Sequence, residues 1–289
     1  MALKGFDRVY FIKPQTALKG ADNFLSKSVH ESPFEVLNGV KTVLLLIKCC
    51  GTTETEHKKD AVISAYYPVS NAAYFAAKQL ANAIIASGAN AVCDSMLAVK
   101  AQLKNAGIGK KGRNSLIFIP GLGSLFTVQI LLTDLELEAD EPNNAELDMC
   151  LNCGLCEYAC PTGAIKHGMV DAVRCLRAYD DITLMPKDLR QALGNRLLGC
   201  DTCQSVCPLN KGLTGKSGIE VDIKPLIYGD VGDLTALIGK NYARKTRLKH
   251  KAMQIAVNLN RSDLYSDIIK NCRIDNEFEN DIIKTINGR

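Results

Sequence analysis

Short apolar runs alternate with amphipathic stretches along the first third of the chain. Residues 9–12 and 41–48 are rich in aliphatic and β-branched side chains, and both runs predict strands. Residues 70–87 carry apolar side chains at helical spacing and predict a helix, with Ser70 or Asn71 as its N-cap. Strands that alternate with helices in this way are typical of an α/β layer.

The same alternation continues after this helix. An extended run at 88–93 precedes a predicted helix at about 95–105, which Gly107 ends as its C′ residue. Two apolar runs, at 115–119 and 125–132, then flank a turn rich in proline and glycine. This arrangement predicts a β-hairpin with a longer loop.

Two polar stretches predict where the chain divides. Residues 136–144 are acidic and rich in turn formers, and residues 212–218 form a glycine-rich connector. Beyond the connector the pattern is largely helical, and residues 253–257 with 264–269 predict one helical hairpin. The sequence therefore predicts an α+β protein in three consecutive parts, at 1–144, 145–212 and 213–289.

Composition places the chain among globular proteins. Its 47% of hydrophobic and 23% of charged residues are ordinary for a folded domain, which excludes a disordered chain. No apolar run approaches the roughly 20 residues that a membrane helix requires, and the N-terminal stretch lacks the apolar core of a signal peptide. We therefore expect a cytoplasmic protein that does not enter the membrane, and we expect a monomer.

Basic residues gather late in the chain, at 240–251. The formal net charge of +4 permits binding to a polyanion but does not argue for it. The run is either the solvated face of a helix or a patch that contacts phosphates. The sequence leaves both interpretations open.

Cysteines carry the strongest chemical signal. In a cytoplasmic chain, twelve cysteines indicate metal or redox chemistry rather than a disulfide framework. Four of them are scattered and are expected to be small buried hydrophobic residues: Cys49, Cys50, Cys93 and Cys272. The other eight fall within one segment: Cys150, Cys153, Cys156, Cys160, Cys175, Cys200, Cys203 and Cys207.

The spacing of these eight cysteines predicts two iron–sulfur clusters. Residues 150–161 read Cys-x2-Cys-x2-Cys-x3-Cys-Pro, the bacterial ferredoxin signature, whose fourth cysteine binds the other cluster in two-cluster proteins. A second motif at 200–208, Cys-x2-Cys-x3-Cys-Pro, supplies three thiols, and Cys175 is the nearest candidate for the missing one. Zinc is the alternative for paired Cys-x2-Cys motifs, but the triple spacing with Cys-Pro disfavours it.

The ligands are therefore expected to interlock between the two motifs. One [4Fe–4S] cluster is assigned Cys150, Cys153, Cys156 and Cys207. The other is assigned Cys160, Cys175, Cys200 and Cys203. Because long segments precede and follow this module, we expect a site elsewhere in the chain that consumes the electrons. Residues 107–109 read Gly-x-Gly but follow a helix, whereas a dinucleotide-binding fingerprint follows a strand.

At these residues the chain resembles the epoxyqueuosine reductases, which are cobalamin- and iron–sulfur-dependent enzymes of tRNA modification related to the reductive dehalogenases. The resemblance is closest at 197–212, which reads LLGCDTCQSVCPLNKG, and extends over about 90–260. The other matching stretches are CPTGAI at 160–165, Arg174–Cys175, LGNR at 193–196, AGIGKKGRN at 106–114, Gly123–Ser124 and LTD at 132–134.

The resemblance implies a cobalamin held by the N-terminal α/β domain beside one cluster. The residues implied to bind it are Gly107, Gly109, Gly112, Arg113, Asn114, Gly123 and Ser124. Glycines there would let the backbone approach a bulky macrocycle, although simple turn geometry would also explain them. Tyr66, Tyr67 and Tyr74 either line the same pocket or belong to the core.

The resemblance also implies an activity and its partners. Electrons from an external low-potential donor would pass through the clusters to cobalt, and the epoxide of a queuosine precursor in tRNA would lose its oxygen. Asp94 stands where the family has its proton donor, and a helix N-cap is the alternative role. The residues expected to meet tRNA phosphates are Arg244, Lys245, Arg247 and Lys249.

Some features depart from the family. Residues 65–74 lack the Asp-Tyr-His of the corresponding stretch, and both terminal regions are shorter. These departures fall where the substrate would bind. Two alternatives therefore stay open: a related cobalamin and iron–sulfur reductase of a small molecule, and a non-enzymatic electron-transfer protein.

Overall fold

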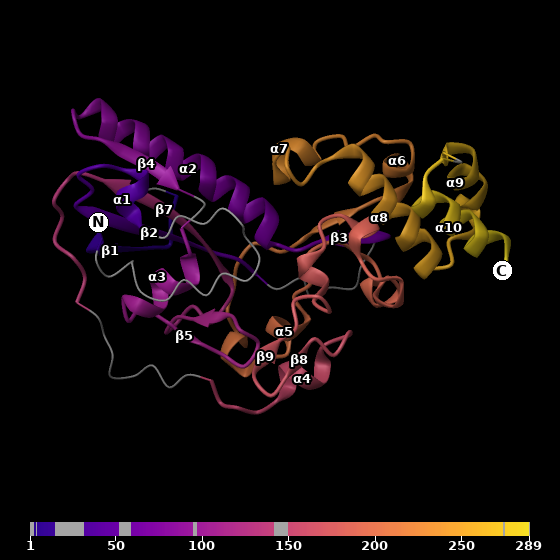
Figure 1. The fold of residues 1–289 in the computed structure, drawn as a ribbon, viewed down its shortest axis with the longest axis horizontal. Helices are drawn as coiled ribbons and strands as arrows, with labels where there is room; N and C mark the ends of the chain where they lie inside the picture. The colour runs from indigo at the N-terminus through magenta and orange to yellow at the C-terminus, as the bar shows by residue number, and fades with distance from the viewer. Residues whose placement is uncertain are drawn as a thin grey trace. The chain divides into compact units, whose positions relative to one another are not determined.

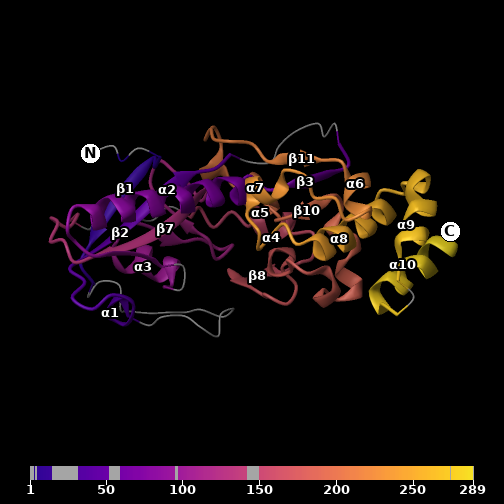
Figure 2. The same ribbon diagram turned by 90° about the horizontal axis from the view of Figure 1, so that it is seen from above.

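The computed structural model describes residues 3, 5–14, 32–51, 59–94, 97–141, 150–273 and 275–288 (Figures 1 and 2). The chain divides into two compact units, each made of separate segments. Unit 1 comprises Met1–Cys50, Val69–Gly154 and Cys207–Gly215. Unit 2 comprises Gly51–Pro68, Leu155–Val206 and Lys216–Arg289. The division into three consecutive parts stays a prediction, because compactness alone does not tell which segments fold on their own.

A four-stranded antiparallel sheet forms the centre of unit 1. Its strands, in spatial order, are β1 (Arg8–Ile12), β2 (Thr42–Cys49), β7 (Phe126–Thr133) and β4 (Ala91–Asp94). The first six residues of β2 are all buried, because both faces of the sheet are covered. The three longest of these strands lie within one residue of the predicted apolar runs.

Two helices cover the faces of this sheet. Ala73, Ala77 and Ala81 of α2 (Tyr66–Ala86) pack on the face that carries Leu44 and Leu46 (Figure 1). The opposite face packs against α3 (Val99–Asn105) and β6 (Ile117–Phe118), and a short helix, α1 (Pro33–Val36), precedes β2.

The predicted ends of the helices are right only in part. α2 ends within one residue of the prediction but begins at Tyr66, so Ser70 and Asn71 lie inside the helix and neither is its cap. Residues 95–96 lie outside the described residues, and α3 begins at Val99 rather than at about 95. Gly107 follows α3 with φ 66°, as expected for a C′ glycine.

The predicted hairpin between 115–119 and 125–132 is wrong. β6 pairs with β5 (Lys110–Lys111), and only a single bridge, from Ile119 to Gly123, spans the glycine-rich turn. β7 instead lies between β2 and β4. All eight residues of β7 pair with β2 there, whereas β6 is only two residues long. The core covers both faces of β7.

Unit 2 contains a small sheet and a group of helices. β3 (Ala61–Ile63) lies between β10 (Arg196–Leu198), to which it is parallel, and β11 (Ile219–Val221), to which it is antiparallel. The helices are α6 (Ile223–Ile227), α7 (Leu234–Ile238), α8 (Lys245–Asn258), α9 (Tyr265–Asn271) and α10 (Glu277–Asn287). The predicted helical character of this end is confirmed, and α10 adds a helix beyond the predicted hairpin.

The cysteine-rich part of unit 2 has little regular structure. Between residues 155 and 206, all of which are described, no helix exceeds five residues. Besides β10, the regular elements are α4 (Leu155–Ala159), the hairpin of β8 (Ile165–Lys166) and β9 (Met169–Val170), four 3-10 turns, and α5 (Thr202–Ser205). Among the described residues, no helix is long and apolar enough to cross a membrane.

Candidate iron–sulfur and cofactor site

The thiols assigned to the second cluster all belong to unit 2 and lie close to one another. Burial raises the pKa of Cys203 to about 12, and the charges of nearby thiols act in the same direction. Those thiols are Cys200, Cys175, Cys156 and Cys160. Buried thiols in such surroundings are protonated until a metal takes the place of the proton. The donor set therefore suits a metal cluster that binds thiolates.

Two of these sulfurs already take part in hydrogen bonds. The backbone N–H of Ala164 donates to Cys160 Sγ at 3.3 Å, and Thr202 Oγ1 lies 3.5 Å from Cys200 Sγ. Burial raises the pKa of Cys160, but hydrogen bonds from Thr162 and from the backbone of Ala164 outweigh it and leave the pKa lowered. Such bonds favour the thiolate, which is the form that binds iron.

Three of the four thiols assigned to the first cluster belong to unit 1. Burial raises the pKa of Cys207, and the charges of Cys153 and Cys150 raise it further against backbone hydrogen bonds from Leu209. These three thiols therefore lie near one another. Cys156 belongs to unit 2, and its place in this ligand set stays a prediction.

The arrangement of the side chains bears on the zinc alternative. Among the described residues, no three His, Cys, Asp or Glu side chains converge as the ligands of a single metal ion do. A [4Fe–4S] cluster sets a different requirement, because each of its thiolates bonds a separate iron atom. The gathered cysteines are compatible with that wider arrangement.

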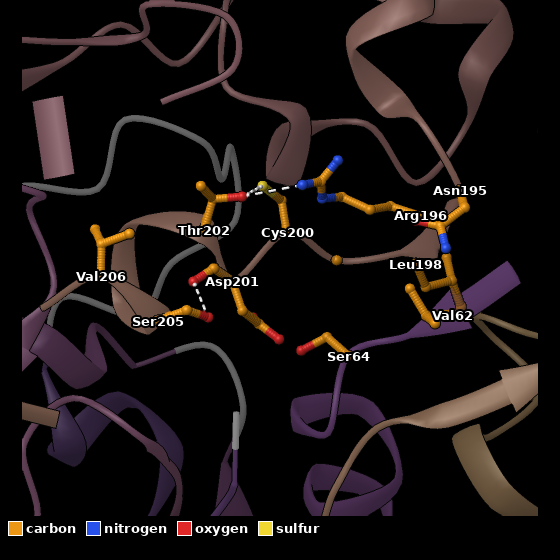
Figure 3. Close-up of a pocket in the computed structure, with 11 residues that line it drawn as sticks. Val62, Ser64, Asn195, Arg196, Leu198, Cys200, Asp201, Thr202, Ser205 and Val206 are labelled. Carbon is orange, nitrogen blue, oxygen red and sulfur yellow. Dashed lines mark hydrogen bonds between the residues drawn. The ribbon is translucent and has the colours of Figure 1, made fainter. Parts of the chain in front are cut away.

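A cavity of about 260 Å³ lies beside Cys200 in unit 2 (Figure 3). Cys200 lies next to Thr202, whose hydroxyl accepts a hydrogen bond from Arg196 Nη2 at 3.1 Å. Ser64 and Asp201 line the same cavity, and their oxygen atoms point toward one another. One thiol assigned to the second cluster, that of Cys200, therefore lines a cavity large enough to hold solvent.

The glycines implied to bind cobalamin are accounted for by packing within unit 1. A Cβ on Gly109 would lie 2.5 Å from Ile117 Cγ2, and one on Gly112 would lie 2.6 Å from Phe118 Cε2. A Cβ on Gly123 would overlap Asn210 and lie 2.7 Å from Leu213 Cδ1. Contacts with the chain's own atoms therefore explain why these three positions are glycine, whether or not a cofactor binds nearby.

The polar residues that the resemblance assigns to cobalamin binding are buried or half-buried. Asn114 Oδ1 accepts a hydrogen bond from the Leu116 N–H at 3.2 Å, and Asn114 is buried, while Arg113 is half-buried. The Ser124 N–H donates to Asn210 Oδ1 at 2.9 Å, and Asn210 Nδ2 donates to Ser124 Oγ at 3.0 Å.

These last two bonds tie the implied cofactor loop to the first cluster. Asn210 ends the 3-10 turn Pro208–Asn210, which begins directly after Cys207. The Gly123–Ser124 loop and the turn that carries Cys207 thus form one hydrogen-bonded arrangement within unit 1. In this respect the residues fit a cofactor held beside that cluster.

Asp94 ends β4 and is 8% exposed. Its Oδ1 accepts a hydrogen bond from the Leu97 N–H at 2.9 Å, whereas the N-cap residue of α3 is Ala98. The alternative role as the cap of the following helix is therefore wrong, because the bond stabilises the loop that precedes the helix. The catalytic role of Asp94 stays a prediction.

The basic run is not uniform. Arg247 Nε lies 3.3 Å from Asp181 Oδ2, and Lys249 Nζ donates to Glu279 Oε1 at 2.9 Å. Arg244 and Lys245 are exposed. The segment is therefore not a wholly solvated helix face, because Leu248, His250 and Lys251 are buried. A phosphate-contacting patch stays a prediction.

The tyrosines and the scattered cysteines also divide by location. Tyr67 is 3% exposed and packs in the core of unit 2, whereas Tyr74 projects from α2 with Lys78 over its ring. Cys50 is buried as expected, while Cys49, Cys93 and Cys272 are half-buried.

Arg177, which lies two residues after Cys175 in the chain, was not identified from the sequence. Its guanidinium lies over the rings of Tyr66 and Tyr67.

Residues 149–210 match the family of 4Fe-4S double cluster binding domains. This range contains all eight cysteines assigned to the two clusters. The prediction of two [4Fe–4S] clusters is confirmed.

Two curated relatives are named epoxyqueuosine reductase. The epoxyqueuosine reductase of Bacillus subtilis (strain 168) is 42% identical over 118 residues, which cover 40% of this chain and 30% of that protein. The epoxyqueuosine reductase of Escherichia coli (strain K12) is 42% identical over 112 residues, covering 37% of this chain and 28% of that protein. The matched part therefore spans about 30% of the length of these relatives, and the expected resemblance is confirmed.

Solved structures show the same fold over nearly the whole chain. The structure of epoxyqueuosine reductase from Bacillus subtilis superposes with a TM-score of 0.72 at 20% identity, covering 98% of this chain and 95% of that one. A crystal structure of epoxyqueuosine reductase with an epoxyqueuosine-modified tRNA-Tyr stem loop also gives 0.72 at 20% identity, covering 98% and 87%. A reductive dehalogenase described as B12-dependent gives 0.51 at 18% identity, covering 92% and 36%. The predicted α+β fold class is confirmed.

Proposed function

We propose that this chain is a cobalamin- and iron–sulfur-dependent reductase that removes the epoxide oxygen of epoxyqueuosine in tRNA. The observation that carries the proposal is the 36–43% identity to proteins named epoxyqueuosine reductase. The shared fold over nearly all of the chain supports it. We further propose that the protein works in the cytoplasm as a monomer with an external low-potential electron donor.

The proposed reaction consumes two electrons and two protons. Both carbon–oxygen bonds of the epoxide break, a carbon–carbon double bond forms, and the oxygen leaves as water. When bound, the clusters would supply single electrons from the donor and cobalamin would supply the strongly reducing centre. Protons come from solvent, and we assign Asp94 to deliver one of them to the departing oxygen. Its burial at the end of β4 keeps bulk water from competing for this role.

The cobalamin site is proposed at residues 107–124 of unit 1. The glycines alone do not support it, because the chain's own packing accounts for them. The support comes from buried Asn114 and Ser124 and from the bonds between Ser124 and Asn210, close in sequence to Cys207. These groups would orient the cofactor and hold it beside the first cluster.

The first experiment asks whether the cofactors bind. Anaerobically reconstituted protein should contain iron and sulfide for two [4Fe–4S] clusters, and titration with cobalamin should change the corrin spectrum saturably. Absence of cobalamin binding in protein with both clusters would remove the reductase proposal and leave an electron-transfer protein.

The second experiment asks what is reduced. Loaded enzyme with a chemical reductant should convert epoxyqueuosine to queuosine in tRNA, followed by nucleoside mass spectrometry. Asp94→Asn should abolish turnover while leaving both clusters and cobalamin binding intact. Asp7→Asn is the matched control in unit 1, since Asp7 is exposed and accepts a hydrogen bond from the Cys49 N–H. Retained turnover in Asp94→Asn would exclude Asp94 from the reaction.

The proposed tRNA contact narrows to Arg244 and Lys245, because Arg247 and Lys249 already pair with carboxylates. Replacing Arg244 and Lys245 by alanine should weaken binding of a tRNA stem loop and lower the salt dependence by about one unit of slope per lost contact. Lys270→Ala, an exposed cation on α9, is the control. An unchanged slope in the double variant would place the tRNA elsewhere.

A second candidate is a cobalamin-dependent reductase of a small molecule. The fold shared with a B12-dependent reductive dehalogenase favours it. Saturable cobalamin binding together with no binding of tRNA and no loss of the epoxide would support this second candidate over the first.

A further inference from the structure

Arg177 holds a hydrogen-bond donor that nothing in its surroundings uses. Arg177 lies on the 3-10 turn Leu176–Ala178, which begins directly after Cys175. Arg177 Nη1 is inaccessible to solvent and has no hydrogen-bond partner among the described residues. A buried donor without a partner destabilises the fold, because it has lost its hydrogen bond to water. An arrangement that keeps such a donor therefore calls for a group that the described residues do not supply.

Aromatic rings rather than carboxylates hold this guanidinium. Its Cζ lies 4.3 Å from the ring centroid of Tyr66 and 4.7 Å from that of Tyr67. Tyr242 packs edge-on against Tyr67 with centroids 4.8 Å apart, which fixes the ring that supports the cation. Within the described chain, no carboxylate lies at ion-pair distance from Arg177. Ring faces position a cation without neutralising it, and an arginine stays charged at any physiological pH.

The same cation lies beside Cys175, one of the thiols assigned to the second cluster. Arg177 follows Cys175 by two residues, and its backbone N–H donates a hydrogen bond to the Cys175 sulfur. Cys200 and Cys160 act on the Cys175 thiol as well, so the cation shares its surroundings with the proposed ligand set. Asp201, adjacent to Cys200, is the carboxylate whose charge acts on Arg177 from this side.

We propose that Arg177 is a fixed positive charge that raises the reduction potential of the [4Fe–4S] cluster bound by Cys160, Cys175, Cys200 and Cys203. The inference rests on that predicted ligand set and on the proposed function. A cluster with four thiolates carries net negative charge, and it gains one more negative charge when it accepts one electron. A nearby cation therefore stabilises the reduced form more than the oxidised form, and net charge and hydrogen bonds to sulfur are among the factors that set such potentials. The effect makes this cluster the better acceptor for an electron from an external donor.

The test measures the potential rather than turnover. In full-length, anaerobically reconstituted protein, Arg177→Gln should raise the ratio of oxidised to reduced second cluster about tenfold at a fixed applied potential. This corresponds to a reduction potential lowered by about 59 mV for one electron. Redox titration followed by electron paramagnetic resonance resolves the two clusters, and the first should keep its potential. Arg177→Lys, which keeps the charge, should retain most of the wild-type value.

A matched arginine controls for lost packing. Arg190 also lies over a ring, 4.9 Å from the centroid of Phe278, but it pairs with Asp281 and lies outside the cysteine motifs. Arg190→Gln should leave both potentials unchanged. Asp201→Asn removes the opposing charge and should raise the potential of the second cluster, so it tests the same idea if Arg177→Gln assembles poorly.

The outcomes separate the two levels of the proposal. Wild-type protein that holds only one cluster would contradict the ligand set and the proposed function. Two clusters with an unchanged potential in Arg177→Gln, or an equal fall in Arg177→Gln and Arg177→Lys, would overturn the role of the charge while leaving the ligand set in place.

Discussion

Unit 1 and unit 2 bury different kinds of side chain. The core of unit 1 is apolar on both faces of its sheet, with Leu44 and Leu46 on one face and Val43 and Leu45 on the other. Unit 2 also has an apolar core, but it encloses charged groups as well. Lys251, for example, is 2% exposed, and its Nζ donates to the Tyr179 carbonyl at 2.8 Å.

The two units consequently differ in what holds their functional segments. Residues 107–124 of unit 1 are packed by neighbouring side chains and strands, so their order requires no ligand. Residues 155–206 of unit 2 consist of turns, strands of two or three residues, and helices too short to be stable alone. Their order rests on packing against α8 and, we infer, on the cluster that their thiols bind. The cysteines of residues 155–206 therefore indicate a ligand more strongly than the glycines of residues 107–124, because neighbouring side chains already explain those glycines.

The largest expected effect comes from removing a cluster ligand. Cys200→Ser should lose the second cluster and expose residues 155–206 to trypsin, with cleavage after Arg174 or Lys187, while the strands of unit 1 stay protected. Metal analysis and mass spectrometry of the fragments measure both effects. Cys272→Ser, a half-buried cysteine of unit 2 outside the motifs, should change neither. Equal protection of residues 155–206 in both variants would contradict the contrast between the units.

The buried carboxylate of Glu279 gives the next effect. Lys249 Nζ and His250 Nε2 lie 2.9 and 3.0 Å from its Oε1, and the Arg273 N–H donates to its other oxygen. Glu279→Gln should lower the free energy of unfolding by about 4 kcal/mol at neutral pH, because it leaves the partly buried Lys249 ammonium without its charge partner. Urea denaturation measures this loss, and Glu277→Gln, exposed on the same helix, is the control.

The same variant should alter the pH dependence of stability. Burial raises the pKa of Glu279, but the hydrogen bonds from the Arg273 backbone and Lys249 outweigh it, so the folded-state pKa lies below the ordinary value. The contribution of Glu279 is therefore complete above about pH 4.3, the unfolded value, and is lost as the pH falls through the folded-state pKa. Glu279→Gln should be less sensitive to acid than the wild-type protein. Identical acid unfolding curves would exclude this role.

The smallest effect tests the packing of unit 1. Gly123 has φ 57° and its Cβ would meet Leu213 and Asn210, whereas Gly121 has φ 74° with only Arg8 within 4 Å. Gly123→Ala should cost about 3 kcal/mol from backbone strain and overpacking, and Gly121→Ala about 1 kcal/mol from strain alone. Thermal unfolding of cobalamin-free protein measures both. Equal losses would show that the space at Gly123 is not filled by the protein itself.

Much of the fold was predictable because its signals are local. The apolar runs of β1, β2 and β7 and the periodicity of α2 reflect burial against the sheet, and each falls close to the observed element. The predicted hairpin failed because strand pairing depends on distant partners. β7 contacts β2, some 80 residues earlier in the chain, and no local pattern specifies that choice.

The candidate site divides in the same way. Ligand spacing within a loop is local, so the eight cysteines could be identified from the sequence. Whether a glycine serves a cofactor or its own hairpin depends on which side chains occupy the adjacent space, as Ile117 and Phe118 do here. Whether a lysine is free for phosphate depends on its neighbours, and Lys249 proved to be paired with a residue thirty positions away.

The sequence by itself determined the chemistry of the cysteine motifs and the positions of the main strands and helices, because both are written in short-range spacing. Only the tertiary structure decided how those elements pair, which charges are buried together, and where Arg177 lies. These properties depend on contacts between segments that are distant in the chain. Tyr66 and Arg177, for example, are more than a hundred residues apart, and only the folded structure shows that the guanidinium lies on the ring.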